Sequence, residues 1–263
     1  MDEKQVARLV RGAATAFGLD PARLERLGGA TGQVLAVDDV VLRVGYPKVL
    51  DHELVASQAA EHVVPVPATL DRYDAPTGDG AVVLLRRAAG TDAGALEGMS
   101  PDRARRRGVA CGRAQAALGQ VPAPAGLPTV RDPGAGATAE HVLLHLDLHP
   151  LNILLDDDDQ VTAVVDWTNS AAGPAAYDRA RTASVLTLDP HLVPLLGHPV
   201  WDAFLGGWSE AAGLDVLPPD ATAWACRYML EDLGGRYPQD GLAHVRAVLD
   251  DALTQGAGET PVL

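Results

Sequence analysis

The feature that most constrains the fold is a run of polar residues set among short apolar segments near the middle of the chain. The sequence reads HLDLHPLN from His145 to Asn152, continues with an apolar run and an acidic turn, and ends a second apolar run at Asp166. Short apolar runs on either side of a turn are typical of a β-hairpin. Such a hairpin would return Asp166 to the neighbourhood of Asn152, so we expect these polar side chains to gather in one place.

The residue types in this segment suit phosphoryl transfer from a nucleotide. That reaction requires a carboxylate to orient the acceptor hydroxyl, oxygen ligands for a divalent metal ion, and a cradle for the phosphates. The pattern HxDxxxxN, followed by an aspartate at the end of a strand, supplies the first two requirements. We therefore expect a phosphotransferase site; the alternative is a set of separate turn and capping roles at this spacing.

The same segment also allows a reading in which a transition metal is used for hydrolysis. His145, Asp147 and His149 alternate along one strand face, and all three residue types are metal ligands. The other histidines form no HxHxDH or HExxH pattern that would supply further ligands. A His/Asp metal-dependent hydrolase is therefore the weaker hypothesis.

Length and charge argue against several other classes of protein. The chain has 263 residues, enough to bury a core without crosslinks, and 35 acidic against 21 basic residues give a formal charge of −14. Most of such a surface would repel nucleic acids and anionic membranes. No apolar run approaches the roughly 20 residues of a membrane span, and the two cysteines form no CxxC motif, so we expect a cytoplasmic protein. The acidic surplus is compatible with a cationic ligand, although solubility alone also accounts for it.

The first 88 residues read as a small mixed lobe. An apolar stripe at helical spacing predicts a helix over residues 3–17, and two β-rich runs at 33–37 and 40–44 predict a hairpin. A helix over residues 48–62 follows, and the two prolines of VPVPATL end it. A further strand is expected over residues 81–85.

Beyond residue 88 the chain becomes mainly helical. Ser100 precedes a proline and an acid, which predicts a helix from there to about Leu118. Residues 120–138 are rich in Pro and Gly and should form a surface loop, and residues 156–159 read as a solvated acidic hairpin tip. We therefore predict an α+β chain with two lobes, 1–88 and 89–263.

The motifs of the central segment resemble those of the aminoglycoside phosphotransferase family, a branch of the protein-kinase-like fold. The family pattern HGDLHPxN appears here as HLDLHPLN, its IDW as VVDW, and its G-P-x-x-D as Gly173-Pro174 followed by Asp178. The chain departs from the pattern at Leu146, where glycine is usual. The resemblance spans about residues 24–235 and is specific over 141–180. It implies a small lobe with an antiparallel sheet that binds the nucleotide and a helical lobe that carries catalysis.

The resemblance also assigns roles to the residues of the central segment. Asp147 would orient the acceptor hydroxyl and receive its proton, while Asn152 and Asp166 would bind Mg²⁺. His145 would be scaffolding, and Asp178 would brace the catalytic loop by accepting its hydrogen bonds. The implied cofactors are ATP, with GTP as an alternative, and Mg²⁺.

In the small lobe the resemblance is weaker but places a nucleotide site. GGATGQVLAV resembles the loop that covers the phosphates, and Arg43 in VVLRV stands where protein kinases carry a lysine. Glu53 is the expected ion-pair partner of Arg43, with Glu61 as the alternative, and an ordinary surface ion pair is the rival reading. The segment from Leu85 to Ala88 would line the adenine slot through backbone groups. The expected nucleotide-binding residues are therefore Gly29, Thr31, Gly32, Arg43, Glu53, Leu85 and Arg87.

The acceptor is expected to be a small molecule with a hydroxyl group. An aminoglycoside or another cationic antibiotic is the first hypothesis, which would imply antibiotic resistance; a sugar or amino-alcohol metabolite is the alternative, and a non-catalytic kinase-like binding protein is a third. Carboxylates against cationic acceptors are common in the C-terminal helices of this family, and the candidates here are Glu210, Glu231 and Asp232, which otherwise belong to solvated helix faces. Nothing in the sequence indicates an oligomeric state.

Overall fold

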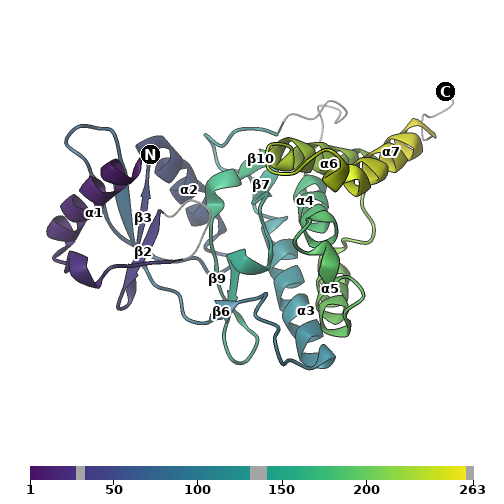
Figure 1. Ribbon diagram of the computed structural model, residues 1–263, viewed down its shortest axis with the longest axis horizontal. Helices are drawn as coiled ribbons and strands as arrows, with labels where there is room; N and C mark the ends of the chain where they lie inside the picture. Colours follow the sequence, from purple (N-terminus) through teal and green to yellow (C-terminus); the bar gives the residue numbers. More distant parts are fainter. Residues whose placement is uncertain (28–32, 131–140, 259–263) are drawn as a thin grey trace.

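The computed structural model describes residues 1–27, 33–130 and 141–258, and these residues form two lobes that lie side by side (Figure 1). The small lobe is built on a five-stranded antiparallel sheet with the strand order β1-β2-β3-β5-β4. Its elements are α1 (Glu3–Phe17), β1 (Glu25–Arg26), β2 (Val34–Val37), β3 (Val40–Gly45), α2 (Pro47–Ala60), β4 (Thr69–Asp74) and β5 (Ala81–Arg86), with the short 3-10 helix η1 (Pro21–Arg23) after α1.

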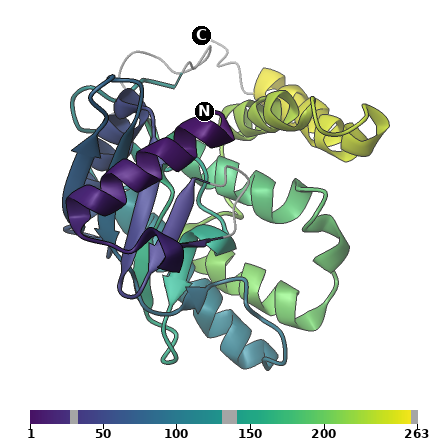
Figure 2. The same ribbon diagram turned by 60° about the vertical axis from the view of Figure 1, so that its left-hand side comes forward.

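The two-residue alternation of the strands explains how this sheet is covered on both faces. Leu42, Val44, Val82 and Leu84 point to one face, where they pack against the apolar stripe of α1, which lies across the sheet (Figure 2). The intervening residues of β5, including Val83, point to the other face and pack against α2. Arg43, which lies between Leu42 and Val44, therefore faces α2.

The large lobe carries the remaining elements and is mainly helical. Its helices are α3 (Pro101–Leu118), α4 (Ala175–Leu188), α5 (Pro199–Ala212), α6 (Pro219–Leu233) and α7 (Ala243–Gly258). Its strands are β6 (Thr91–Asp92), β7 (Val142–Leu144), β8 (Ile153–Leu155), β9 (Val161–Val164) and β10 (Ala171–Gly173), paired as β10-β7 and β6-β8-β9. The short 3-10 helices among its described residues are η2 (Pro150–Asn152), η3 (Trp167–Asn169), η4 (Val193–Leu195) and η5 (Asp240–Leu242). The α+β architecture expected from the sequence, with an antiparallel sheet in the small lobe and a mainly helical large lobe, is confirmed.

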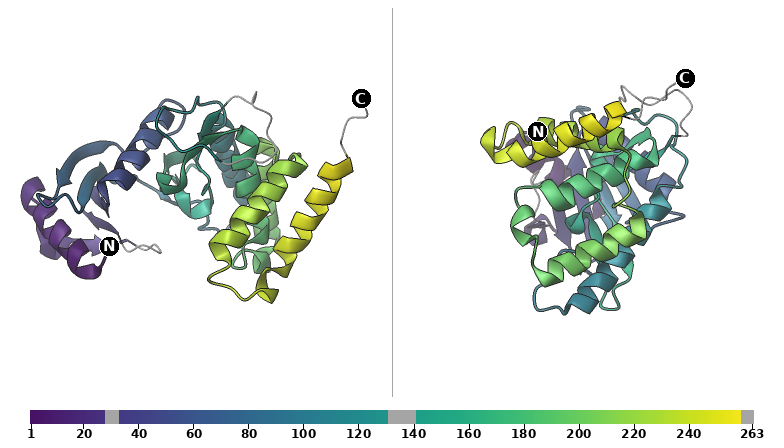
Figure 3. Two further views of the ribbon diagram at one scale, coloured as in Figure 1. Left: turned by 90° about the horizontal axis from the view of Figure 1, so that it is seen from above. Right: turned by 90° about the vertical axis from the view of Figure 1, so that its right-hand side faces the viewer.

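Helices α3 and α5 form the densest contact of the large lobe, and glycines allow their close approach. A Cβ on Gly108 would lie 1.9 Å from the carbonyl oxygen of Phe204, and a Cβ on Gly207 would lie 2.3 Å from that of Arg105. The core around this crossing contains Phe204 and Trp208 with no exposed surface. The tryptophans of α5 therefore serve in core packing, as their helical spacing predicts. Figure 3 shows these helices in the lobe away from the small-lobe sheet.

Most predicted elements are found within a few residues, and two local expectations are corrected. Strand β4 was not predicted because its sequence, TLDRYD, lacks an apolar alternation and most of its residues are exposed. The acidic tip of the β8–β9 hairpin is not wholly solvated, because the side chain of Asp159 is only 8% exposed and pairs with Arg103 at 3.0 Å. Asp156 shapes the same turn by accepting hydrogen bonds from the backbone N–H groups of Asp158 and Gln160.

Two further expectations concern the cysteines and membrane insertion. Cys111 and Cys226 are free thiols buried in the large lobe, and burial raises the pKa of Cys226 to about 11. They act as small apolar side chains in the core. No helix in the described part of the chain combines the length and apolar character needed to cross a bilayer.

Candidate active site

The catalytic loop, residues 145–152, follows strand β7 and begins with an unusual backbone conformation. Leu146 adopts a positive φ of 61°, which is unfavourable for any residue with a Cβ. The side chain of Leu146 is buried against Leu144, Ala171 and Tyr177 and points away from the catalytic loop's polar face. The left-handed conformation explains why glycine is usual at this position, and burial of the leucine side chain offsets part of the conformational cost here.

Asp178, near the start of α4, holds the loop in this conformation. Its Oδ1 accepts the backbone N–H groups of His145 and Leu146, each at 2.7 Å, and its Oδ2 accepts the side-chain amide of Gln115 at 3.2 Å. The carboxylate is buried, so these hydrogen bonds replace the water that it loses. Asp178 has the contacts expected of a residue that braces the loop.

His145 connects the loop to the end of strand β9. Its Nδ1 accepts the backbone N–H of Asp147 at 3.3 Å, and its Nε2 donates to the carbonyl of Val165 at 3.0 Å, next to Asp166. The ring packs against that of Trp167 with centroids 4.7 Å apart. Burial lowers the pKa of His145, although the charges of Asp178, Asp147 and Asp166 oppose this shift. A neutral imidazole with the proton on Nε2 satisfies both contacts, which are of the kind expected of a scaffolding residue.

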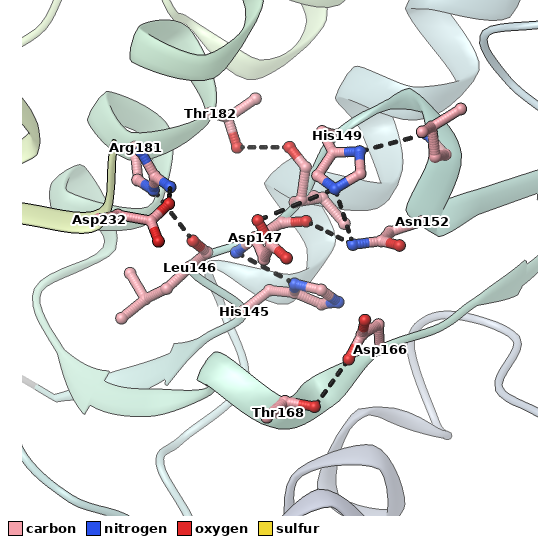
Figure 4. Close-up of polar contacts among 12 residues, drawn as sticks. His145, Leu146, Asp147, His149, Asn152, Asp166, Thr168, Arg181, Thr182 and Asp232 are labelled. Atoms are coloured by element: carbon pink, nitrogen blue, oxygen red, sulfur yellow. Dashed lines mark hydrogen bonds and ion pairs between the residues drawn. The ribbon is translucent and has the colours of Figure 1, made fainter. Parts of the chain in front are cut away.

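Asp147 and Asn152, five residues apart in the loop, are joined by a hydrogen bond. The Nδ2 group of Asn152 donates to the backbone carbonyl of Asp147 at 2.9 Å and also lies 3.1 Å from Nε2 of His149. These contacts orient the amide so that its oxygen is the atom available to a ligand. The carboxylate of Asp147 is a quarter exposed, with Nε2 of His149 at 3.8 Å from Oδ1. Figure 4 shows the hydrogen bond from Asn152 to Asp147 and the position of His149 beside both residues.

Asp166 follows β9 and lies next to the loop, as the hairpin predicts. The N–H of Val165 donates to the carbonyl of Asn152 at 2.9 Å, which fixes the strand end against the loop. Asp166 itself has a positive φ of 63°, which directs the chain into η3. Its side chain is 46% exposed and accepts the hydroxyl of Thr168 at 2.7 Å (Figure 4).

Oxygen ligands of this kind fit a hard divalent cation. A carboxylate and an amide oxygen are the donor types that Mg²⁺ takes from proteins, with water and substrate phosphates completing its coordination. The exposed carboxylate of Asp166 and the oriented amide of Asn152 meet that description. The two histidines of the loop instead have separate partners, His145 in the β9 direction and His149 towards Asn152. His149 lies near Asp147, but within the described part of the chain no three His, Cys, Asp or Glu side chains gather as a hydrolytic metal site would require.

Arg43 and Glu53 form the ion pair expected between β3 and α2. Nε of Arg43 donates to Glu53 at 3.0 Å and Nη2 at 2.7 Å, a bidentate arrangement, and Arg43 Nη2 lies 3.7 Å from Asp166. Burial lowers the pKa of Arg43, but the hydrogen bonds and charge of Glu53 and the charge of Asp166 outweigh it and raise the pKa above its ordinary value. The side chains of the pair are less than 15% exposed, so this is not an ordinary surface ion pair. Glu61, the alternative partner, lies against His62 instead.

The other nucleotide-binding candidates come from the glycine-rich segment after β1 and from the end of β5. Gly29, Thr31 and Gly32 lie outside the described residues. Leu85 is half-buried in β5, an interior strand of the sheet that pairs with β3 and β4. The backbone N–H of Arg87 donates to the carbonyl of Asp39 at 2.8 Å, so a nucleotide contact by Arg87 would have to use another of its groups.

The acceptor candidates divide into two groups. Asp232 on α6 lies 3.5 Å from Nη2 of Arg181, whose Nε donates to the carbonyl of Leu146 in the catalytic loop at 3.3 Å (Figure 4). Glu231 is its exposed neighbour on α6. Glu210, at the end of α5, pairs with Arg105 on an exposed surface of α3, and that contact connects it to α3 and not to the catalytic loop.

Sequence reasoning overlooked two residues that the structure brings into the site. Arg181 is buried, contacts the loop carbonyl, and lies over the ring of Tyr228 at 4.7 Å. Its position three residues after Asp178, on the same face of α4, is the signal that would have identified it. Thr168 contacts Arg43, Glu53 and Asp166, and its sequence neighbourhood carried no signal beyond its place two residues after Asp166.

Comparison with known proteins agrees with this geometry. A family model described as the phosphotransferase enzyme family matches residues 133–214, which contain the catalytic loop, Asp166 and Asp178. No sequence among curated proteins matches this chain.

Several solved structures share the fold over nearly the whole chain. A mutant of aminoglycoside 2′-phosphotransferase-IIIa in complex with GDP is 17% identical, with 98% of this chain and 99% of that chain covered and a TM-score of 0.62. Aminoglycoside phosphotransferase APH(3″)-Id from Streptomyces rimosus is 17% identical, with 86% and 96% covered and a TM-score of 0.61. A choline/ethanolamine kinase family protein from Mesorhizobium loti is 18% identical, with 98% and 95% covered and a TM-score of 0.50. The resemblance inferred from the motifs is thereby confirmed.

Proposed function

We propose that this chain, which has the catalytic-loop motif and the fold of the phosphotransferases, transfers the γ-phosphoryl group of a nucleoside triphosphate to a hydroxyl group of a small molecule. The observation that carries this proposal is the arrangement around the catalytic loop. Asp147, Asn152 and Asp166 come from two segments that hydrogen bonds hold together, with His145 between them. The family match covers these residues.

In the proposed reaction Asp147 is the general base. Its carboxylate accepts a hydrogen bond from the acceptor hydroxyl and takes the proton while the hydroxyl oxygen forms a bond to the γ-phosphorus. The bond between that phosphorus and the oxygen bridging to the β-phosphate breaks, and the nucleoside diphosphate leaves. The partial exposure of Asp147 allows an acceptor to reach it, and its fixed loop limits the orientations that the carboxylate can take.

Asn152 and Asp166 would hold Mg²⁺, which when bound neutralises the charge of the phosphates. Arg43 would contribute from the small lobe. Its bonds to Glu53 and Thr168 use Nε and Nη2, so Nη1 is the part of the guanidinium available to a phosphate oxygen. ATP is the proposed donor; GTP is the alternative, and the similar aminoglycoside phosphotransferase was solved with GDP.

The proposed acceptor is an aminoglycoside or another cationic antibiotic, and the enzyme would then confer antibiotic resistance. The acidic chain supports a cationic acceptor, and Asp232 with its neighbour Glu231 lies on the helix that faces Arg181 and the catalytic loop. The similar structures named above include two aminoglycoside phosphotransferases.

A second candidate is an amino alcohol, and one feature of α6 favours it. Trp224 and Tyr228 have ring centroids 5.3 Å apart, and Tyr177 packs edge-on against Trp224. Burial raises the pKa of Tyr228, the charge of Arg181 opposes this shift, and the charges of Asp147 and Asp232 add to it. Aromatic faces close to a carboxylate are suited to substituted ammonium groups. The structural likeness to the choline/ethanolamine kinase family protein agrees with this candidate.

The test is a transfer assay with radiolabelled ATP and Mg²⁺ against a panel of aminoglycosides, amino alcohols and sugars. The wild-type protein should label members of one class, and Asp147→Asn should lower the rate by at least 10²-fold, the contribution typical of a general base, without changing the thermal unfolding midpoint. Glu210→Gln, which removes an exposed carboxylate from another surface, is the matched control and should retain full activity. An Asp147→Asn protein as active as the wild type would contradict the proposal.

A further inference from the structure

Thr168, in η3, connects the small lobe to the metal-binding carboxylate through a single hydroxyl group. Its Oγ1 lies 2.9 Å from Nη2 of Arg43, 2.8 Å from Oε1 of Glu53 and 2.7 Å from Oδ1 of Asp166. Arg43 and Glu53 belong to β3 and α2, whereas Asp166 follows β9 of the large lobe. The hydroxyl group therefore stands at the contact between the lobes.

The number of protons decides how this contact is made. A guanidinium can only donate, so the Thr168 oxygen accepts one hydrogen bond from Arg43. The hydroxyl has one proton to give, and two carboxylates lie within reach. Both oxygens of Glu53 already accept from Arg43, at 3.0 and 2.7 Å, whereas the half-exposed Asp166 lies 3.7 Å from that guanidinium. We therefore assign the hydroxyl proton of Thr168 to the hydrogen bond with Asp166. Hydrogen bonds then run in one direction, from Arg43 to Thr168 and from Thr168 to Oδ1 of Asp166.

The hydrogen bonds from Arg43 through Thr168 to Asp166 leave one carboxylate oxygen of Asp166 free to bind a cation. With Oδ1 held by Thr168, Oδ2 is the oxygen that can bind a metal ion together with Asn152. Hydrogen bonds that end on charged groups are stronger than neutral ones, and a chain of them is cooperative. The orientation of Asp166 is thus determined by the position of Arg43 and α2.

A second contact between the same elements provides a natural comparison. The hydroxyl of Ser170 donates to the carbonyl of Trp167 at 2.7 Å, so it accepts from Nε2 of His52 on α2, 2.9 Å away. This contact joins α2 to the segment after η3 but does not reach Asp166. Mutation of Ser170 therefore tests only the attachment of α2 to the segment after η3. Mutation of Thr168 also tests the orientation of the Asp166 carboxylate.

We propose that Thr168 is a positioning residue that transmits the placement of the Arg43–Glu53 pair to Asp166, and so couples binding of the divalent cation to binding of the nucleotide phosphates. This inference rests on the proposed function, in which Arg43 contacts phosphate and Asp166 binds Mg²⁺. A phosphate bound to Arg43 would then affect the orientation of Asp166 through the hydrogen bonds that Thr168 makes with both residues. Coupling of this kind is reciprocal, so either ligand improves the affinity for the other.

The test measures ATP binding by calorimetry with and without Mg²⁺, using wild type, Thr168→Val, Thr168→Ser and Ser170→Ala. In Thr168→Val, which keeps the shape of the side chain, the factor by which Mg²⁺ improves ATP affinity should fall roughly tenfold, the effect of losing one hydrogen bond to a charged group. ATP affinity without Mg²⁺ should change less than about twofold, because the Arg43–Glu53 pair remains. Thr168→Ser should restore the Mg²⁺ effect, and Ser170→Ala should keep it.

Any of three results with the variants would overturn the inference: an unchanged Mg²⁺ effect in Thr168→Val, no rescue by Thr168→Ser, or an equal loss in Ser170→Ala. Thr168→Ala replaces the valine variant should that variant fail to fold, as judged by its thermal unfolding. ATP binding is measured without an acceptor. Failure of the inference can therefore be distinguished from failure of the proposed transfer reaction. A wild type that binds ATP equally with and without Mg²⁺ would refute the metal assignment itself and the inference with it.

Discussion

The backbone N–H of Leu146 donates to the buried carboxylate of Asp178 at 2.7 Å, and Leu146 makes this contact in a left-handed conformation with φ of 61°. The same oxygen accepts the N–H of His145, also at 2.7 Å. Two consecutive N–H groups can point to one atom because the positive φ turns the chain sharply after β7. The backbone that precedes Asp147 is thus fixed by one buried carboxylate on α4.

Replacement of Asp178 should therefore damage stability as well as rate. Asp178→Ala would leave two buried N–H groups without partners, at about 1–3 kcal/mol each, so the free energy of unfolding in urea should fall by roughly 3–5 kcal/mol. Asp178→Asn keeps an oxygen that can accept both hydrogen bonds, and its loss should be less than half as large. An alanine variant within about 1 kcal/mol of the wild type would show that water replaces the carboxylate and that the brace is dispensable.

Substitutions of Leu146 should separate backbone strain from side-chain packing. Both Leu146→Ala and Leu146→Gly remove a buried side chain, which costs about 2–5 kcal/mol, but only glycine relieves the positive φ. The free energy of unfolding of Leu146→Gly should therefore exceed that of Leu146→Ala by about 1 kcal/mol, the reverse of the usual order of glycine and alanine. Both proteins should keep transfer activity, because the side chain points away from Asp147. Denaturant midpoints that rank Ala above Gly would contradict the strain.

The contrast between Leu146 and Thr168 shows what the sequence could and could not reveal. The catalytic loop is a continuous motif, so its residues could be identified from the sequence, and the roles that the family resemblance implies for them stay predictions. The alternation around Arg43 follows from strand geometry. Thr168 acquires its role only where two lobes meet, 115 residues from Glu53 in sequence. Asp159 was misjudged for the same reason, since the arginine that covers it lies 56 residues earlier on α3. Contacts of this range leave no local pattern.

The two acidic groups predicted for acceptor binding should respond differently to mutation. Asp232 is linked to the catalytic loop through Arg181, whereas Glu210 pairs with Arg105 on an exposed surface. For a cationic acceptor, Asp232→Asn should raise KM roughly tenfold with a smaller effect on kcat, because the lost attraction acts mainly on binding. Glu210→Gln should change neither constant by more than about twofold. Steady-state kinetics with a saturating nucleotide measures both, and equal effects of the two variants would exclude Asp232 as an acceptor contact.

His145 should make stability depend on pH below neutrality. Burial lowers its pKa in the folded protein beneath the ordinary value of 6.5, so the unfolded chain binds more protons below that pH. Stability is then fully present above pH 6.5 and is lost as the pH falls, by up to about 1.4 kcal/mol per pH unit from this group. His145→Gln removes the titration, and the unfolding free energy of this variant should fall less steeply between pH 6.5 and 5. His62→Gln, at an exposed position, is the control and should follow the wild type. If the slopes of wild type and His145→Gln coincide, the buried imidazole takes up a proton without cost and its neutral form does not hold the loop.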